Sequence, residues 1–365
     1  MISKLKIITV VGARPQFIKA AAVSRAISSH FSDKIEEKII HTGQHFDENM
    51  SQVFFDELGV PKPHYNLAIS GGSHGAMTGR MLEGIEQVLL NEKPDWLLIY
   101  GDTNSTLAGA LAAAKLHIPI AHVEAGLRSF NMRMPEEINR IVSDRISTLL
   151  FCPTETAVQN LKAEGITRGA INVGDVMYDV ALYYKNRGVQ SSNILERLNL
   201  LGKNFILATC HRAENTDDII RLTNIIEALA QLAKSKPVVL PLHPRTKKLL
   251  ADFGMENKLG SILCVDPLPF LDMVALEQSA KIIMTDSGSV QKEAFFYGVP
   301  CITMREETEW VETVDLGWNI LVGASKEKIL EAENSFLNED LKKTIILPYG
   351  NGDASIGIIK NLLQH

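Results

Sequence analysis

The chain has 365 residues, more than one ordinary hydrophobic core supports, and this length fits two domains. Its composition, 45% hydrophobic and 22% charged residues, is typical of globular proteins. A net charge of −6 argues against a broadly basic surface for nucleic acid, but it leaves room for a local basic pocket. The apolar run Ile7–Val11 is short and is followed by Arg14 and Lys19, so we expect no signal peptide, no membrane insertion and a cytoplasmic protein.

The first half of the chain alternates short β-branched runs with amphipathic helical patterns, which indicates βαβ units and a parallel sheet. Expected helices include 16–29, 106–116 and 154–165. The expected strands are Lys6–Val11, Glu37–His41, Trp96–Tyr100, Ile118–Val123 and Thr148–Phe151.

A second series of strands and helices begins near Asn204, after a helical and then polar stretch, 174–203, that is a plausible linker. Expected helices include 217–234, 271–279, 290–297 and a terminal one at 354–363. The expected strands are Phe205–Thr209, Val238–Leu242, Ile262–Val265, Ile282–Met284, Cys301–Met304 and Ile320–Val322. The predicted fold is therefore α/β, with two Rossmann-like domains, residues 1–175 and 176–350, facing each other across a cleft.

The cysteines, Cys152, Cys210, Cys264 and Cys301, are widely separated, and each stands in an apolar, strand-like context. This favours buried, reduced thiols over disulfides or a metal site. No strand is followed by a G-x-G-x-x-G or Walker motif, and no metal-ligand spacing occurs. The sequence therefore predicts no cofactor.

The first strand runs into Gly12-Ala-Arg-Pro-Gln-Phe-Ile-Lys19. Pro15 suits the first position of a helix, so Arg14 and Lys19 would lie at a helix N-terminus, where free N–H groups favour anions. A phosphate-binding turn and a surface turn with two solvated cations explain this motif equally well.

Carboxylates follow two further strands of the first half. Asp102 comes directly after Trp96–Tyr100, and Glu124 after Ile118–Val123, although Asp102 would also suit a helix N-cap. Pro135 then opens a helix with Glu136 and Glu137 in its first turn. Because carboxyl ends of parallel strands bind ligands, these acids suggest proton transfer on an anionic substrate. Glu137 also fits a structural ion pair with Arg140 at helical spacing.

The second half repeats this arrangement with basic and hydroxyl residues. His211 and Arg212 follow one strand, and His243 and Arg245 follow the next, which favours an anion site. The turn Thr285-Asp-Ser-Gly-Ser289 begins a helix, and its N–H groups with the Ser287 and Ser289 hydroxyls suit a diphosphate. Glu293, further along that helix, suits a ribose diol.

Taken in order, these motifs resemble those of the non-hydrolysing UDP-N-acetylglucosamine 2-epimerases, from residue 7 to about 356. The matching segments are GARPQFIK, GDTNST, HVEAGLRS, MPEEINR, HRAEN, LPLHPR, TDSGSVQKEA and PYGNGDAS. The resemblance implies a glycosyltransferase-B-like arrangement, with the segment 351–365 returning as a helix to the N-terminal domain. It also implies a homodimer that needs no metal or nicotinamide cofactor. The implied substrate is a UDP-sugar, and the product is used in the synthesis of surface polysaccharides such as O-antigen.

The resemblance implies roles for particular residues. Asp102, Glu124 and Glu136 resemble the acid/base carboxylates, and which of them takes the C2 proton stays open. His211 and Arg14 are placed to stabilise the leaving diphosphate. The residues that resemble the UDP site are Lys19, Arg212, His243, Ser287, Gly288, Ser289 and Glu293.

Some positions depart from the usual family pattern. Ser289 replaces a glycine, Trp310 replaces an arginine, and Gln16 replaces a glutamate. Gln44-His-Phe46 stands where Gln-His-Arg is common. These changes resemble the branch that acts on UDP-2,3-diacetamido-2,3-dideoxy-glucuronic acid, so the substrate and any activation by UDP-N-acetylglucosamine stay open. A UDP-sugar glycosyltransferase of the same architecture and a non-catalytic nucleotide-sugar-binding protein are the alternatives, and three acids around one sugar ring favour neither.

Overall fold

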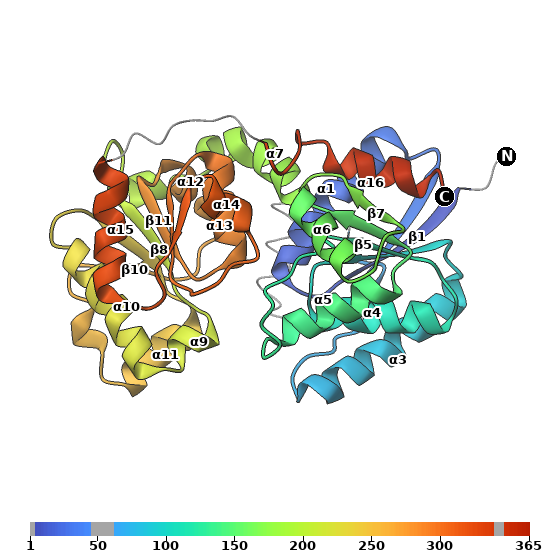
Figure 1. Ribbon diagram of the computed structural model, residues 1–365, viewed down its shortest axis with the longest axis horizontal. Coiled ribbons are helices and arrows are strands. Elements are labelled where there is room, and N and C mark those ends of the chain that lie inside the picture. The colour runs from blue at the N-terminus through green and yellow to red at the C-terminus, as the bar shows by residue number, and fades with distance from the viewer. Residues whose placement is uncertain (1–3, 45–61, 339–346) are drawn as a thin grey trace. The chain divides into compact units, whose positions relative to one another are not determined.

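A computed structural model describes residues 4–44, 62–338 and 347–365, without the side chains of 186–190 and 338. The chain divides into two compact units, Met1–Val180 with Leu347–His365, and Ala181–Ile346. Each unit is an α/β unit built on one parallel sheet with flanking helices, as Figure 1 shows. The predicted α/β class is confirmed. In the described part of the chain, no helix has the length and apolarity that crossing a membrane requires.

The N-terminal unit contains a seven-stranded parallel sheet in the order β3-β2-β1-β4-β5-β6-β7. The chain order reverses between β1 and β4, and in open parallel sheets ligands bind at the carboxyl ends beside such a reversal. The strands are β1 Leu5–Val11, β2 Ile35–His41, β3 Tyr65–Asn66, β4 Trp96–Tyr100, β5 Ile120–Val123, β6 Leu149–Cys152 and β7 Ala170–Asn172.

Helices cover this sheet, so the central strands are apolar on both faces: all five residues of β4 are buried. The C-terminal helix α16 contacts α1 within the same unit, and Asp179 accepts hydrogen bonds from the backbone N–H groups of Ala354 and Ser355 at its start. The helices of this unit are α1 Arg14–His30, α3 His74–Glu92, α4 Asn104–Lys115, α5 Pro135–Ile146, α6 Glu155–Ala163 and α16 Ala354–Leu362. Helix α7, Val176–Ser191, begins in this unit and continues into the second, which starts at Ala181.

The C-terminal unit contains a six-stranded parallel sheet in the order β10-β9-β8-β11-β12-β13, with its reversal between β8 and β11. The strands are β8 Ile206–Thr209, β9 Val238–Pro241, β10 Leu263–Val265, β11 Ile282–Thr285, β12 Cys301–Thr303 and β13 Asn319–Leu321. The helices are α8 Ile194–Arg197, α9 Ala213–Thr216, α10 Ile219–Leu232, α11 Pro244–Asp252, α12 Phe270–Ser279, α13 Gly288–Tyr297, α14 Val311–Asp315 and α15 Lys326–Asn338, with a short 3-10 helix at Glu256–Lys258.

The strands expected from sequence are all present, within two residues at each end. Two further strands, β3 and β7, have only two and three residues and lie at the sheet edges, where a short half-exposed run gives little apolar signal. One burial prediction is wrong. Cys152, Cys210 and Cys301 are buried, but Cys264 is exposed because β10 is an edge strand whose outer residues face solvent.

Candidate active site

The turn between β1 and α1 is held by Gln16. Its Oε1 accepts hydrogen bonds from the backbone N–H groups of Gly12 (2.8 Å) and Ala13 (3.0 Å), and its Nε2 donates to the carbonyl of Tyr100 (2.7 Å). This one side chain therefore ties the end of β1 to the end of β4. Gly12 is required because a Cβ there would lie 2.1 Å from Ser105 Oγ. Arg14 begins α1 with Pro15 in its first turn, as predicted.

Glu124 directly follows β5 and bonds to Lys19, the last cation of the β1–α1 motif. Lys19 Nζ lies 2.5 Å from Glu124 Oε1, and the two side chains are only 8% and 11% exposed. Glu124 has a φ of +69°, a conformation that costs a non-glycine residue about 1 kcal/mol or more and that tertiary contacts must hold. A Cβ added at Gly101 would lie 3.5 Å from Lys19 Nζ and 3.6 Å from Glu124 Oε1. The ion pair therefore lies against the turn that carries Asp102.

Asp102 faces a guanidinium and does not cap a helix. Thr103 is the N-cap of α4, so the capping interpretation of Asp102 is wrong. Arg140 Nη2 lies 2.5 Å from Asp102 Oδ2, and Asn139 Nδ2 donates to the Asp102 carbonyl (2.8 Å). Both partners come from α5, so α5 fixes the position of the Asp102 turn.

The adjacent acids of α5 have different surroundings. Glu137 is buried and accepts hydrogen bonds from the Phe130 backbone N–H (2.9 Å) and from Arg140 Nη1 (2.8 Å), which confirms the predicted ion pair. Burial alone would raise the pKa of the Glu137 carboxyl, but hydrogen bonds from Ser129, Arg140 and Phe130 outweigh it and hold that pKa below its ordinary value. Glu136 is half-buried and has no hydrogen bond or ion pair with any described residue.

The position of Glu136 on α5 links it to the Asp102 turn. Residues three and four apart on a helix share one face, and Asn139 and Arg140 stand at these spacings from Glu136. Both of them contact Asp102. The three predicted carboxylates thus belong to one neighbourhood at the carboxyl edge of the N-terminal sheet, with two of them already paired to cations.

In the C-terminal unit, Asp286 organises the turn after β8. It is fully buried and accepts hydrogen bonds from the backbone N–H groups of His211 and Arg212 (both 3.0 Å) and from Asn215 Nδ2 (3.2 Å). His211 Nδ1 lies 3.5 Å from Asp286 Oδ1, and the ring is 42% exposed. The Asp286 carboxylate therefore orients His211 through Nδ1, and the exposed part of the ring is open to a ligand. Sequence reasoning did not assign a role to Asp286.

The N-terminus of α13 is an anion-binding element. Ser287 is its N-cap but forms no side-chain cap, so backbone N–H groups of the first turn are available to a ligand. Gly288 brings the backbone close to three polar groups: a Cβ there would lie 3.5 Å from Trp310 Nε1 and 3.9 Å from both Arg212 Nη2 and Glu309 Oε2. Ser289 is half-buried in the same turn, and Glu293 is almost buried further along the helix.

Trp310, which stands where the family pattern has an arginine, covers a buried cation. Lys292 is 2% exposed, and its Nζ lies 3.8 Å from the centroid of the indole ring. Beside it the buried Arg305 pairs with Glu309, with Nη1 and Oε2 3.2 Å apart. An ammonium group therefore lies beneath the indole ring at this position. The sequence shows the substitution, but it gave no indication of the contact with Lys292.

His243 and Arg245 have fewer contacts with the other predicted site residues of this unit. His243 is exposed and caps α11, where its Nδ1 accepts from the Arg245 backbone N–H (3.2 Å), and Arg245 pairs with Asp217. Next to them a hollow of about 610 Å³ opens at the carboxyl edge of the sheet. Its lining combines the apolar Leu242, Val265, Pro267, Leu268 and Pro269 with the charged Arg197, Lys247 and Asp266. The apolar part of the lining suits the faces of a planar base.

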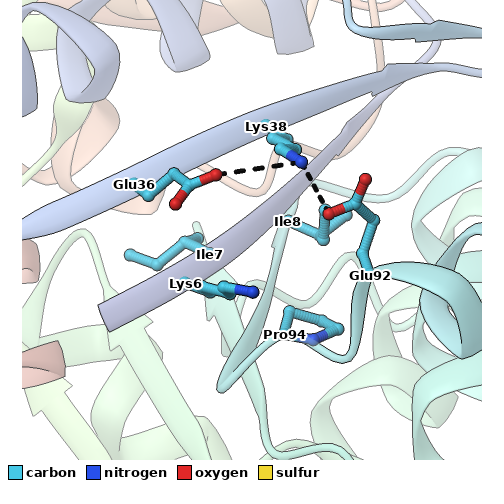
Figure 2. Close-up of a pocket in the computed structure, with 7 residues that line it drawn as sticks. All are labelled: Lys6, Ile7, Ile8, Glu36, Lys38, Glu92 and Pro94. Atoms are coloured by element: carbon cyan, nitrogen blue, oxygen red, sulfur yellow. Dashed lines mark hydrogen bonds and ion pairs between the residues drawn. The ribbon is translucent and has the colours of Figure 1, made fainter. Parts of the chain in front are cut away.

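A second hollow lies at the amino edge of the N-terminal sheet. Figure 2 shows Lys38 between Glu36 and Glu92 there, with Pro94 on the opposite side. Its volume is about 10 Å³, room for about one water molecule. Of the Gln44–Phe46 motif, His45 and Phe46 lie outside the described residues.

Comparison with known proteins identifies the family. Residues 28–363 match the family described as UDP-N-acetylglucosamine 2-epimerase. The chain is 54% identical to the UDP-2,3-diacetamido-2,3-dideoxy-D-glucuronate 2-epimerase of Pseudomonas aeruginosa, covering 99% of this chain and 100% of the relative. It is 45% identical to the UDP-N-acetylglucosamine 2-epimerase of Methanocaldococcus jannaschii, covering 98% and 99%.

Solved structures give the same result. The M. jannaschii enzyme in complex with UDP-GlcNAc and UDP matches with a TM-score of 0.92 at 44% identity, over 99% of this chain and 100% of that one. The UDP-GlcNAc 2-epimerase from Neisseria meningitidis bound to UDP-GlcNAc matches with a TM-score of 0.89 at 31% identity, over 99% and 100%. The chain therefore belongs to the UDP-N-acetylglucosamine 2-epimerase family.

Proposed function

We propose that this isomerase inverts C2 of a UDP-2-acetamido sugar by eliminating UDP and adding it back. The observation that carries the proposal is the carboxylate group at the carboxyl edge of the N-terminal sheet, Asp102, Glu124 and Glu136. Two of these acids lie within 2.5 Å of a cation. Inversion at C2 requires a base on one face of the ring and an acid on the other, which explains more than one carboxylate at the same edge.

Direct deprotonation at C2 is unfavourable because the C2 proton is not adjacent to a carbonyl group, so the reaction proceeds by elimination and re-addition. A base takes that proton, the C2–H electron pair forms the C1–C2 double bond, and the C1–O bond breaks with its electrons leaving on UDP. The intermediate is a 2-acetamidoglycal together with free UDP. A proton is then delivered to C2 from the opposite face while UDP re-forms the C1–O bond. Atoms and charge balance without a redox cofactor.

The surroundings of the acids suggest how they divide this work. Glu124 and Asp102 each bond to a cation, Lys19 and Arg140, which fixes the position of the two carboxylates. Glu136 has no such partner in the described part of the chain, so its carboxyl is free to turn towards a ligand. We assign proton removal and delivery to these three residues jointly.

The C-terminal unit supplies the UDP site in this proposal. The N-terminus of α13 with Ser287, Gly288 and Ser289 suits the diphosphate. Arg212 lies beside it, His211 is held by Asp286, and Glu293 suits the ribose diol. The further contacts we propose for the nucleotide are Arg14, Lys19 and His243.

We infer that the substrate is a UDP-2,3-diacetamido-2,3-dideoxy-glucuronate rather than UDP-N-acetylglucosamine. The 54% identical P. aeruginosa relative bears that name, and Trp310 departs from the common pattern. The segment 129–134 leads into Glu136 and is anchored by Glu137, and it exposes the Arg133 side chain. A guanidinium at this place suits the carboxylate that distinguishes a glucuronate from a glucose derivative.

Two measurements test this proposal. Incubation with the substrate in deuterated water puts deuterium at C2, and absence of exchange with every UDP-2-acetamido sugar overturns the reaction class. A glycosyltransferase would instead transfer the sugar without exchange. A side-by-side assay tests the substrate: Arg133→Met lowers kcat/KM for the uronate about 10-fold or more and leaves UDP-N-acetylglucosamine unchanged. Equal effects on both substrates would remove Arg133 from substrate selection.

The setting of the reaction is also a proposal. We infer a homodimer in the cytoplasm that supplies sugar nucleotides for surface polysaccharides such as O-antigen. This setting rests on the family resemblance, since the names of the relatives give the epimerase activity alone. Light scattering with size-exclusion chromatography measures the mass, and a 40.3 kDa species at working concentration would contradict the dimer.

A further inference from the structure

We propose that His122 is a positioning residue for the proposed reaction, held as a doubly protonated imidazolium behind the acid/base carboxylates. His122 belongs to β5 and is fully buried. Its Nε2 lies 2.7 Å from the carbonyl oxygen of Gly101, and its Nδ1 lies 2.7 Å from Asp144 Oδ1 on α5. The ring therefore spans the distance between the Asp102 turn and α5.

The hydrogen-bond partners determine the charge of this ring. A carbonyl oxygen can only accept, and an ionised carboxylate can only accept. Asp144 Oδ2 already accepts from the Gly126 backbone N–H (3.1 Å) and from Arg128 Nη1 (2.7 Å), which leaves no place for a proton on that oxygen. Oδ1 also carries no proton, because the Arg128 guanidinium on the other oxygen favours the ionised carboxylate. With Asp144 ionised, a neutral imidazole, which has one N–H, would leave one of its two short contacts without a proton. Both ring nitrogens of His122 are therefore donors.

Asp144 is held in the form that this arrangement needs. Burial alone would raise the pKa of the Asp144 carboxyl, but hydrogen bonds and charges from His122 and Arg128 outweigh burial and lower that pKa. The charges also balance. His122 and Arg128 carry two positive charges, and Asp144 and Glu164, whose Oε1 lies 2.6 Å from Arg128 Nε, carry two negative ones. A balanced, hydrogen-bonded group of this kind tolerates burial.

The function of this group is to fix the two turns that carry Asp102 and Glu124. Gly101 has a φ of +61°, Glu124 of +69° and Gly126 of +80°, so the backbone beside both acids is in the left-handed region. His122 bonds to the first turn directly, and it bonds to the second through Asp144 and the Gly126 N–H. The network thereby sets the separation of the two carboxylates without contacting the substrate.

A variant series separates positioning from a structural role. Glutamine at 122 can donate only one of the two bonds, so the Gly101 or the Asp144 link is lost. A displacement of about 1 Å at a reacting group can cost about 10²-fold in rate. We therefore expect His122→Gln to lower kcat for C2 exchange about 10²-fold, with KM for the UDP-sugar and the Kd for UDP close to wild type. His117→Gln is the matched control, because His117 is exposed and lies just before the same strand.

The charge state is measured without any activity. In ¹⁵N-histidine-labelled wild-type protein, long-range ¹H–¹⁵N spectra should show one ring, absent from His122→Gln, with protons on both nitrogens at neutral pH. A neutral tautomer for that ring overturns the imidazolium. Wild-type turnover in a folded His122→Gln overturns the positioning role, and so does a proportional loss of UDP affinity.

If His122→Gln does not fold, Asp144→Glu, which keeps the charge but displaces the link, provides the same kinetic comparison. This inference rests on the proposed function, but the two fail differently. The proposed function fails if wild-type enzyme gives no C2 exchange. The inference fails on the ratio of variant to wild type and on the nitrogen spectrum.

Discussion

Glu136 and Glu137 are adjacent, chemically identical side chains, and the structure predicts opposite consequences for the same substitution. Glu137→Gln should destabilise the N-terminal unit, whereas Glu136→Gln should leave its stability unchanged and remove turnover. The reason is that Glu137 is buried against four donor contacts and Glu136 is half-buried without a described partner. Each variant serves as the control for the other.

The size of the effect follows from the contacts. The Glu137 carboxylate accepts from Ser129 N, Ser129 Oγ, Phe130 N and Arg140 Nη1 at 2.8 to 3.0 Å. A glutamine keeps one oxygen and turns an NH₂ group towards donors. Removing one partner of a buried ion pair costs about 3–5 kcal/mol. Because Arg140 keeps its contact with Asp102, we expect the lower end, about 3 kcal/mol. For a unit of this size that corresponds to about 6–12 °C in Tm.

Scanning calorimetry measures both variants, and deuterium incorporation at C2 measures turnover. Glu136→Gln should stay within about 0.5 kcal/mol of wild type in stability and lose about 10² or more in kcat. Wild-type stability in Glu137→Gln would refute the reasoning. So would full turnover in Glu136→Gln with the substrate confirmed by the wild-type enzyme.

Three further predictions rest on other parts of the chain. Folding lowers the pKa values of Glu137 and Asp144, so both carboxylates stabilise the fold above their ordinary pKa values of 4.5 and 3.8. That contribution is lost as the pH falls through the lowered pKa values of the folded protein. The free energy of unfolding should therefore fall more steeply below pH ~5 in wild type than in Glu137→Gln. Lys292→Met should raise the UDP dissociation constant about 10-fold in calorimetry. Trp310→Phe, which keeps a ring over the ammonium and removes the N–H, should have a smaller effect. An unchanged dissociation constant in Lys292→Met would show that the cation contributes nothing. Iodoacetamide should alkylate Cys264 in the folded protein and the three buried cysteines only after unfolding, as judged by mass spectrometry; modification of a buried cysteine at the same rate would contradict the burial.

The sequence predicted the sheets well because their signals are local. A central parallel strand is a continuous apolar run, and glycine or a polar residue ends it, so the end of β4 at Tyr100 and the start of the Asp102 turn are readable directly. Glu124 was identifiable for the same reason, since it continues a buried strand. The Glu137–Arg140 pair was also predictable, because its three-residue spacing is set by the helix itself.

The partners of the acids could not be predicted, because they are set by packing between distant segments. Lys19 and Glu124 are separated by 105 positions, and Arg140 and Asp102 by 38. The sequence placed Lys19 only as a nucleotide contact and Arg140 only as a helix neighbour. Nothing in spacing distinguishes a cation that reaches across a sheet edge from one that faces solvent.

The two units use their cations differently, and this difference explains how one chain can hold an anion and move protons. In the N-terminal unit, Lys19 and Arg140 bond directly to the carboxylates Glu124 and Asp102 at the strand ends, so each of these acids has a cationic partner. In the C-terminal unit, the buried carboxylate Asp286 accepts from backbone and amide N–H groups, and Arg212 stays beside the positive end of α13. The Arg212 guanidinium and the N-terminus of α13 therefore lie together at the edge where we propose that the diphosphate binds. Because the glycal intermediate and UDP must both stay bound between elimination and re-addition, an enzyme of this kind needs both kinds of edge. Substitutions of the carboxylates at the edge of the N-terminal sheet should then change kcat. Substitutions beside the N-terminus of α13 should change the retention of UDP.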